Sequence, residues 1–153
     1  MRKYIIALLS MIAFSTQSVC AQEMATPDEA KAMALRAAEY VKTVGAEKAF
    51  AAFGTPGGEW HDRDLYIAVV TADGTQPLNG ANTAMNGKNF WNLQDINGKF
   101  FYREVAAVEK ETWVEYIWKN PVTQKPATKK AYVVNVDGYR VLSGAYEKLP
   151  ESK

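Results

Sequence analysis

Aromatic side chains and one lysine recur on the predicted strands of this sequence, and these residue types can bind a small anion. Members two positions apart share a face of their strand, and the set comprises Tyr66, Tyr116, Trp118, Lys130, Tyr132 and Tyr146. A carboxylate in an apolar cavity needs a cation and oriented hydroxyl or indole donors, because an unpaired buried anion is unfavourable. Lys130 and the tyrosines supply those groups. The pattern leaves a second interpretation open, ordinary aromatic packing with Lys130 solvated beside Lys129.

A second group of residues, around the single histidine, has the types that acid and base catalysis needs. His61 is followed by Asp62 and Asp64 and preceded by Trp60. Charged residues beside a glycine-rich loop are usually solvated, so we do not expect an enzyme. A small periplasmic lyase or hydrolase that uses His61 with Asp62 or Asp64 remains the alternative.

Other common catalytic and metal sites lack the necessary side chains. Ser143 and Ser152 are the only serines beyond the N-terminal segment, and Ser143 lies within a predicted strand rather than at a strained turn. A zinc site needs three or four ligands, mostly nitrogen or sulfur. His61 is the only histidine, and no cysteine follows position 20. We therefore expect neither a metal nor another cofactor.

The first 21 residues have the pattern of a bacterial secretion signal. Two basic residues precede an apolar run over 4–14, and small residues follow at 19–21. We expect a signal peptide at 1–21, cleavage between Ala21 and Gln22, and a periplasmic protein without stable membrane insertion after cleavage. The apolar run is shorter than the roughly 20 residues that span a bilayer. Retention as an uncleaved anchor is the alternative.

The charge balance of the mature chain excludes nucleic acid as a partner. The full sequence has 18 basic and 17 acidic residues, and removal of Arg2 and Lys3 leaves 16 and 17, a net charge of −1. Such a chain has no basic field to hold a phosphate backbone. We expect a single domain at 28–148, after a short linker at 22–27 and before a polar tail at 149–153.

Spacing and turn signals predict the elements that position these side chains. The capping box at Thr26–Glu29 begins one long amphipathic helix. Asp-Gly pairs at 73–74 and 137–138 predict hairpin turns. Further helical segments are predicted over 46–53 and 100–110, an ordered loop over 79–99, and strands over 65–71, 112–118, 130–136 and 139–146. This order predicts an α+β fold in which a helix backs an antiparallel sheet.

The chain also carries a recognisable series of motifs. In chain order they are the long helix, the Tyr66 strand, the Asp73-Gly74 hairpin, the Gly87-Lys88-Asn89 loop, Tyr116-x-Trp118 with Pro121, Lys130-x-Tyr132 and Gly144-x-Tyr146. This ordered set resembles the single Cache domain of type 2, over nearly the whole mature chain. The resemblance implies a PAS-like Cache fold, with a long N-terminal helix packed on a central antiparallel sheet of about five strands.

The resemblance further implies a ligand pocket on the other face of the sheet. Such domains are usually extracytoplasmic sensors of small molecules, often carboxylates. Lys130 becomes the expected anion partner, with aromatic residues as walls and donors. The ligand-binding residues that this implies are Tyr66, Tyr116, Trp118, Lys130 and Tyr132, with Trp60, His61 and Tyr146 as further candidates.

We therefore expect a periplasmic module that binds or senses a small organic acid such as pyruvate, lactate, acetate or propionate. Typical members of the family lie between two membrane helices ahead of an output module, and this sequence has neither. We expect the domain to act without an attached output domain, either presenting its ligand state to a membrane receptor or transporter or simply capturing the ligand. An interaction module with a vestigial pocket is a further alternative.

Overall fold

The computed structural model describes residues 23–147. The predicted signal peptide at 1–21, its cleavage site after Ala21 and the polar tail at 149–153 lie outside the described residues. Across 23–147, no helix has the length and apolar character needed to cross a membrane.

The first helix begins where the capping box predicts. α1 (Pro27–Val44) follows Thr26, whose hydroxyl accepts the backbone N–H of Glu29 at 3.3 Å. The Glu29 carboxylate accepts the backbone N–H of Thr26 at 2.7 Å in return. The buried face of α1 consists mostly of small side chains, which allows the helix to approach the sheet closely. The buried residues are Ala30, Met33, Ala34, Ala37, Ala38 and Val41. α2 (Ala46–Phe53) continues after a break at Gly45.

Five antiparallel strands form the central sheet in the order β5, β3, β9, β8, β7. Their bounds are Ala68–Val70 for β3, Leu78–Asn79 for β5, Glu111–Lys119 for β7, Pro126–Val136 for β8 and Tyr139–Glu147 for β9. Two small sheets pair β1 (His61–Asp62) with β2 (Leu65–Tyr66) and β4 (Thr75–Gln76) with β6 (Lys88–Asn89). The predicted turn between β8 and β9 is present, because Asp137 and Gly138 both have positive φ, 50° and 82°.

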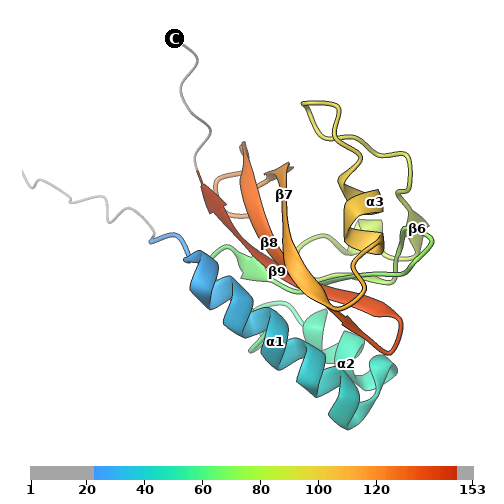
Figure 1. Cartoon of the computed structure of the whole chain (residues 1–153). Coiled ribbons are helices and arrows are strands. Elements are labelled where there is room, and N and C mark those ends of the chain that lie inside the picture. The colour runs from blue at the N-terminus through green and yellow to red at the C-terminus, as the bar shows by residue number, and fades with distance from the viewer. Residues whose placement is uncertain (1–22, 148–153) are drawn as a thin grey trace, which may run out of the picture.

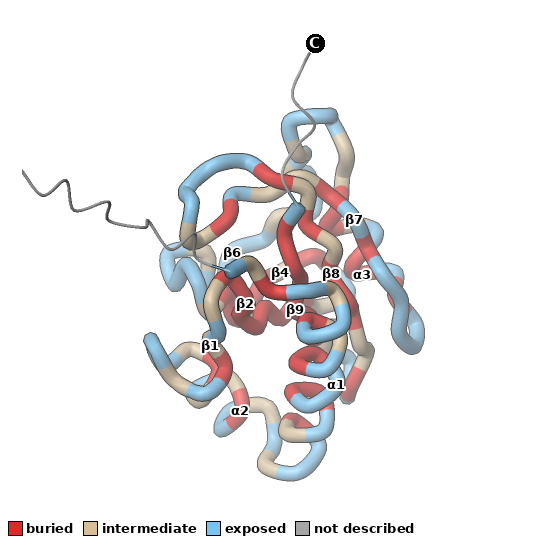
Figure 2. The backbone as a smooth tube through the Cα atoms, turned by 90° about the vertical axis from the view of Figure 1, so that its left-hand side faces the viewer, coloured by how far each residue is buried: buried red, intermediate tan, exposed pale blue. Residues whose placement is uncertain are grey.

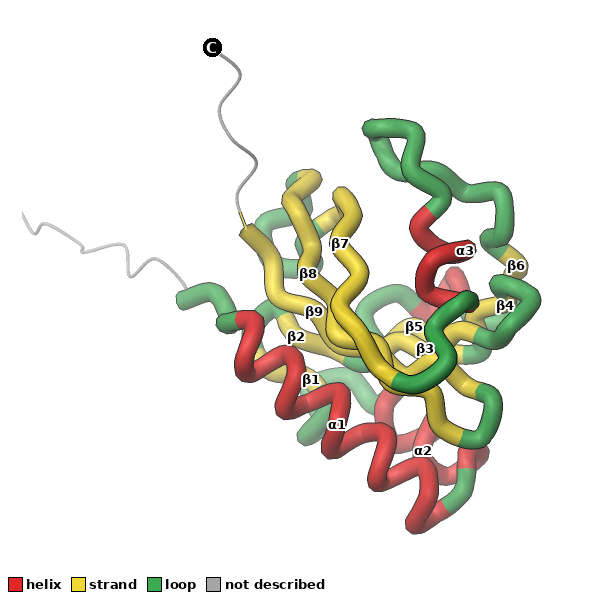
Figure 3. The backbone as a smooth tube through the Cα atoms, viewed as in Figure 1, coloured by secondary structure: helices red, strands yellow, loops and turns green. Residues whose placement is uncertain are grey.

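The sheet separates two packed layers (Figure 1). α1 lies along β8 and β9 on one face, and α2 joins the same layer. The other face carries α3 (Phe101–Ala106), which is shorter than the predicted segment at 100–110. Figure 3 shows the helices on the two sides of the strands, and Figure 2 shows buried residues along β8, β9 and one side of α1. The structure confirms the predicted α+β fold with its five-stranded sheet.

The segment at 79–99 is ordered, as predicted, and covers part of the α3 layer. It contains a short 3₁₀ helix, η1 (Thr83–Met85), in addition to β6. Met85, Phe90 and Leu93 pack against the buried side chains of that layer. Trp91 and Ile96 remain 39% and 68% exposed, so only part of its apolar side chains contribute to packing.

β8 differs from its predicted extent in a way that affects the site. It begins at Pro126 rather than at 130 and is hydrogen-bonded on both sides, to β7 and to β9. Lys129, Ala131 and Val133 face the α3 layer, whereas Lys130 and Tyr132 face the α1 side. Lys129 therefore belongs to the strand and is directed to the interior.

Candidate functional site

A small cavity lies between the sheet and α3. Its volume is about 20 Å³, which is room for about one water molecule. Its aromatic walls are Tyr66, Tyr102, Tyr116 and Trp118, and its aliphatic walls are Ala68, Val70, Val105 and Leu142. Its other polar residues are Gln76, Asn79 and Lys129. Among these described lining residues there is no acidic side chain.

Lys129 is the only cation in this lining, and its side chain is 1% exposed. Its ammonium group lies 4.0 Å from the centroid of the Tyr66 ring and 5.1 Å from that of Tyr146. Within residues 23–147, no carboxylate is paired with it. Cation–π contacts offset part of the loss of hydration, but a buried ammonium normally has an anionic partner. The cavity therefore presents a positive charge whose natural counterpart is an anion.

Gly144 of β9 provides the space that Lys129 occupies. A Cβ atom at position 144 would lie 2.6 Å from Cε of Lys129, 2.9 Å from Cα of Ala131 and 2.9 Å from the carbonyl oxygen of Lys130. All three separations are far shorter than van der Waals contact. The absent side chain at Gly144 thus lets the lysine lie flat across β9.

The tyrosines around the lysine are buried, and burial affects the ionisation of three tyrosines of this layer. The hydroxyl groups of Tyr66 and Tyr146 are hydrogen-bonded at 3.1 Å. Burial raises the pKa values of Tyr102, Tyr116 and Tyr146 well above the usual range. These phenols are therefore neutral hydrogen-bond donors at physiological pH.

α3 fixes the outer wall of the cavity through its aromatic side chains. The Phe101 ring stacks on Tyr116 with centroids 4.2 Å apart and planes 9° apart. Trp118 meets the same Phe101 ring edge-on at 5.3 Å. Tyr102 points its hydroxyl toward β4 and donates to Oε1 of Gln76 at 2.7 Å. The wall is held by aromatic contacts and one polar contact between α3 and β4.

The cavity continues toward the surface on the side of η1. An adjoining hollow of about 240 Å³ shares Tyr66, Asn79 and Trp118 with it. The rest of this hollow is formed by the turn at 81–85 and the turn at 119–124. The hollow therefore lies between these two turns and shares three lining residues with the cavity.

The structure brings together four of the residues that the sequence predicted. Tyr66, Tyr116 and Trp118 line the cavity. Tyr146 lies behind the lysine, with its ring against the ammonium group and its hydroxyl bonded to Tyr66. These four come from β2, β7 and β9, so the predicted convergence of strands on one face is present.

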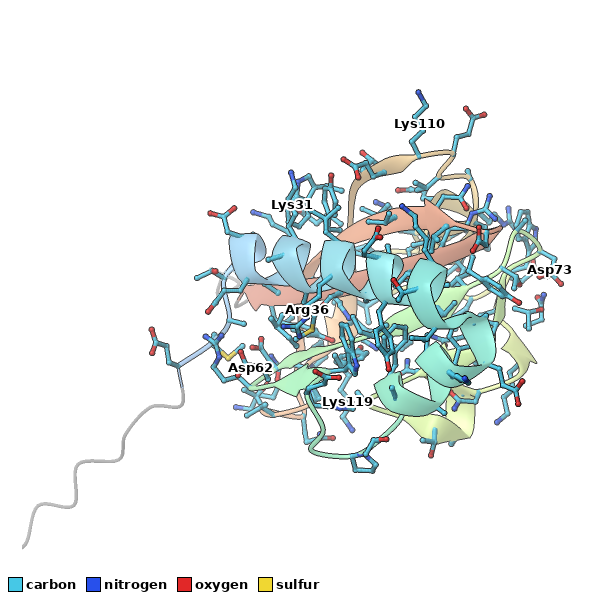
Figure 4. The ribbon with its side chains drawn as sticks, turned by 90° about the horizontal axis from the view of Figure 1, so that it is seen from below. Lys31, Arg36, Asp62, Asp73, Lys110 and Lys119 are labelled. Carbon is cyan, nitrogen blue, oxygen red and sulfur yellow. The ribbon has the colours of Figure 1, made fainter. Side chains whose placement is uncertain are left out.

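Lys130 and Tyr132 lie on the opposite face of the sheet from this cavity, which corrects their expected placement. Lys130 is partly exposed and its ammonium group pairs with the Glu147 carboxylate at 2.8 Å. Tyr132 packs against Trp113 with centroids 4.9 Å apart, and the Lys31 ammonium of α1 lies 4.7 Å from its ring. Figure 4 shows Lys31 on α1, on this side of the sheet. Side chains alternate along a strand, so residue 129 rather than residue 130 points into the cavity.

The residues around the histidine do not form an acid–base pair. His61 Nε2 is hydrogen-bonded to the carbonyl oxygen of Gly80 at 2.9 Å. Asp62 pairs with Arg63 at 2.7 Å, and fully buried Asp64 accepts the backbone N–H of Ala25 at 2.8 Å. Within the described part of the chain, neither carboxylate is hydrogen-bonded to His61. The His61 contact attaches β1 to the loop after β5, and the Asp64 contact attaches the chain before α1 to the turn between β1 and β2.

Trp60 belongs to the layer on the α1 side. Its ring lies 4.7 Å from that of Phe53 and 5.3 Å from that of Tyr40. The guanidinium of Arg36 covers it at 4.7 Å. The sheet therefore separates Trp60 from the cavity.

Sequence reasoning missed Lys129, Gln76 and Tyr102. The β7–β8 register would have identified Lys129, because it places this residue opposite Tyr116, which the sequence had already assigned to the pocket. Gln76 and Tyr102 lie outside the central sheet, on β4 and α3. Their approach to the cavity follows from the packing of the 79–99 segment, which no local pattern encodes.

Comparisons with known proteins agree with this architecture. The search of curated proteins found no match. A methyl-accepting chemotaxis protein from Vibrio parahaemolyticus RIMD 2210633 has a similar structure, with a TM-score of 0.69 and 18% identity over 78% of this chain and 86% of that one. A structure described as the periplasmic sensor domain of a chemotaxis protein gives 0.56 and 20%, covering 78% and 88% of the two chains.

A third similar structure is described as the "structural basis for carboxylic acid recognition by a Cache chemosensory domain". Its TM-score is 0.60 at 18% identity, and it covers 78% of this chain and 86% of that one. At these identities the likeness shows a common fold. The family model described as single Cache domain 2 matches residues 1–148. That match spans nearly the whole sequence, and the chain belongs to the single Cache domain 2 family.

Proposed function

We propose that this domain binds a small monocarboxylate in the cavity around Lys129 and serves as a periplasmic sensing module. The observation that carries the proposal is the ammonium group of Lys129, which is buried between Tyr66 and Tyr146 without a carboxylate partner in the described chain. A bound carboxylate would supply that partner. Tyr116 lies opposite Lys129 in the sheet register, so a neutral phenol donor is close to the same anion.

Electrostatics favours an anion over other small molecules at this position. Removing an ammonium group from water is strongly unfavourable unless an opposite charge compensates it. Hydrogen bonds from a cation and from phenols to a carboxylate are among the stronger ones in proteins. A neutral ligand would leave the lysine uncompensated.

The volume of the cavity restricts the ligand to a few heavy atoms. At about 20 Å³ the cavity admits such a molecule only if its walls move outward, and the shared wall with the 240 Å³ hollow is the place for that movement. Acids of two or three carbons, such as acetate, propionate, lactate and pyruvate, fit this restriction. The similar structure described in terms of carboxylic acid recognition supports the same ligand class.

A thermal-shift screen of small organic acids tests the proposal. A ligand at about 100 times its Kd adds roughly 2.7 kcal/mol to the free energy of unfolding. For a domain of this size that raises the melting temperature by about 8 °C or more. We expect at least one two- or three-carbon acid to produce this shift, and a screen in which none does would refute the proposal.

The neighbouring lysines offer a matched pair of variants. Lys129→Met removes the charge in the cavity while keeping a long unbranched side chain, and we expect it to abolish the shift. Lys130→Met removes an equal charge from the opposite face, and we expect the shift to persist. Because loss of an uncompensated buried charge often stabilises a fold, the ligand-free Lys129→Met protein should melt at or above the wild-type temperature. Equal loss of binding in both variants would place the anion elsewhere.

The proposed location depends on the signal peptide at 1–21. We expect the protein in the periplasmic fraction, with a mature N-terminus at Gln22, and a membrane receptor or transporter as its partner. Cell fractionation followed by N-terminal sequencing checks the location. An intact Met1 in the membrane fraction would indicate an uncleaved anchor instead.

A further inference from the structure

Gln76 is a second polar group of the cavity, separate from the lysine. It is 2% exposed, and its Oε1 atom accepts the Tyr102 hydroxyl at 2.7 Å. Across residues 23–147, its Nε2 group has no hydrogen-bond acceptor. Gln76 lines the cavity, so an acceptor placed there would give this amide group a hydrogen bond.

The Gln76 amide and the Lys129 ammonium group reach the cavity from different elements, β4 and β8. Lys129 is paired with Tyr146 in the register, and its side chain crosses Gly144, which lies toward Leu142 along β9. Leu142 pairs with Ala68 of β3. The hairpin after β3 returns with the Thr71 amide bonded to the Thr75 carbonyl at 2.9 Å, which brings Gln76 beside the end of β3. Lys129 thus leans along the sheet toward the region that Gln76 lines.

The remaining walls restrict what lies between these two groups. Ala68, Val105 and Leu142 give an apolar surface, and none of the described lining residues is acidic. A ligand ammonium group would have no countercharge and would be repelled by Lys129. A small acid that also carries a neutral oxygen acceptor would satisfy both groups. Because both groups line the same small cavity, that oxygen must lie close to the carboxylate, as it does on the adjacent carbon.

We propose that the site selects 2-oxo or 2-hydroxy monocarboxylic acids, with Lys129 holding the carboxylate and Gln76 Nε2 donating to the oxygen on C2. This inference rests on the proposed carboxylate-binding function and adds its selectivity. Sites that hydrogen-bond a substrate oxygen discriminate strongly against analogues that lack it, because the protein group is then left unpaired.

Calorimetric titration with four compounds of three carbon atoms each tests the selectivity. Pyruvate and lactate carry the C2 oxygen, propionate lacks it, and L-alanine replaces it with an ammonium group. We expect pyruvate or lactate to bind wild-type protein about tenfold tighter than propionate or more, and L-alanine to show no binding. Equal affinity for propionate, or binding of L-alanine as tight as that of lactate, would overturn the inference.

Variants of Gln76 assign the selectivity to its amide. In Gln76→Leu we expect the preference over propionate to fall below about threefold while propionate binds as in the wild type. If Gln76→Leu does not fold, Gln76→Met replaces it in the experiment, because methionine keeps an unbranched chain of similar length. Melting curves measured by circular dichroism without ligand check that each variant is folded. A preference retained in the folded variant would overturn the role of Gln76.

The outcomes separate this inference from the function on which it rests. If propionate binds wild type as tightly as pyruvate and Lys129→Met loses both, the carboxylate site stands and the selectivity is refuted. If wild-type protein binds none of the three acids, the carboxylate site itself is refuted and the selectivity with it.

Discussion

Two adjacent lysines show how strongly the site depends on single positions. Lys129 is buried against Tyr66 and Tyr146, whereas Lys130 is partly exposed and paired with Glu147. Hydrogen bonding to Glu147 raises the pKa of Lys130, and solvent screens the pair. The chemical type is the same, so the difference in their surroundings comes from the direction in which each side chain leaves β8.

Substitution of Gly144 tests whether the placement of Lys129 matters. In Gly144→Ala the new Cβ would lie 2.6 Å from the lysine Cε atom and 2.9 Å from backbone atoms of β8. The lysine can move, but the backbone contacts cannot be relieved without shifting a strand. We expect a loss of about 1–3 kcal/mol in the free energy of unfolding, the range for overpacked interiors, together with weaker ligand binding. Urea denaturation and titration with pyruvate measure the two effects.

A double variant separates the lysine contact from the backbone contacts. Lys129→Ala in the Gly144→Ala background removes the shortest contact, and we expect part of the lost stability to return. Coupling of this kind is usual for residues in direct contact. Additive effects of the two substitutions would contradict the proposed packing of the lysine over position 144.

At the scale of elements, the strands could be predicted from the sequence. The face of the sheet to which each side chain points could be predicted for β7 but not for β8. Tyr116 and Trp118 were placed correctly because they lie two positions apart in β7 and share the face that also carries buried Val114, whereas Glu111 and Glu115 lie on the other face. β8 is covered by β7 and β9 at its edges and by a layer on each face, so Ala131, Tyr132 and Val133 are all buried. Alternation then gives no polar face, and a shift of one residue exchanges Lys129 for Lys130.

The start of α1 is attached to the β1–β2 hairpin through charged groups. Arg63 donates to Glu29 at 2.6 Å and to Asp62 at 2.7 Å. The hydrogen bond from Arg63, and then those from the backbone and hydroxyl of Thr26, lower the pKa of Glu29 from 4.5 to about 2. A carboxyl group with a lowered folded-state pKa stabilises the fold above its unfolded pKa, and this contribution disappears as the pH falls from about 4.5 to about 2.

Glu29→Gln tests this attachment, since glutamine preserves the capping box and removes only the charge. We expect the variant to melt at a slightly lower temperature than the wild type at pH 7, and the difference to close as the pH falls to about 2. Glu47→Gln, an exposed residue in the first turn of α2, is the control and should show little change at any pH. A Glu29→Gln difference that is the same at pH 7 and pH 2 would mean that charge has no part in it.

For the whole molecule, the sheet separates the layer of α1 and α2 from the layer that contains the proposed binding cavity. α1 and α2 pack on one face, and the cavity lies on the other, beneath α3 and the 79–99 segment. The long helix and the antiparallel sheet were predictable from hydrophobic spacing and turn signals, and the face of the sheet that carries the cavity was implied by the family resemblance. Tyr102 and Gln76 were not, because they reach the cavity only through contacts between segments far apart in the sequence.

This division predicts where a ligand changes local stability. A bound acid would join Lys129 of the sheet to Tyr102 of α3 and Gln76 of β4, so opening of that layer would also require loss of the ligand. We expect hydrogen–deuterium exchange to slow on addition of pyruvate in α3, β4 and the segment at 79–93, and to remain unchanged in α1 and α2. The Lys129→Met protein with the same pyruvate concentration is the control and should show no slowing. If protection appeared in α1 and α2 and spared α3, the ligand would bind on the other face of the sheet, and the cavity around Lys129 would not be the site.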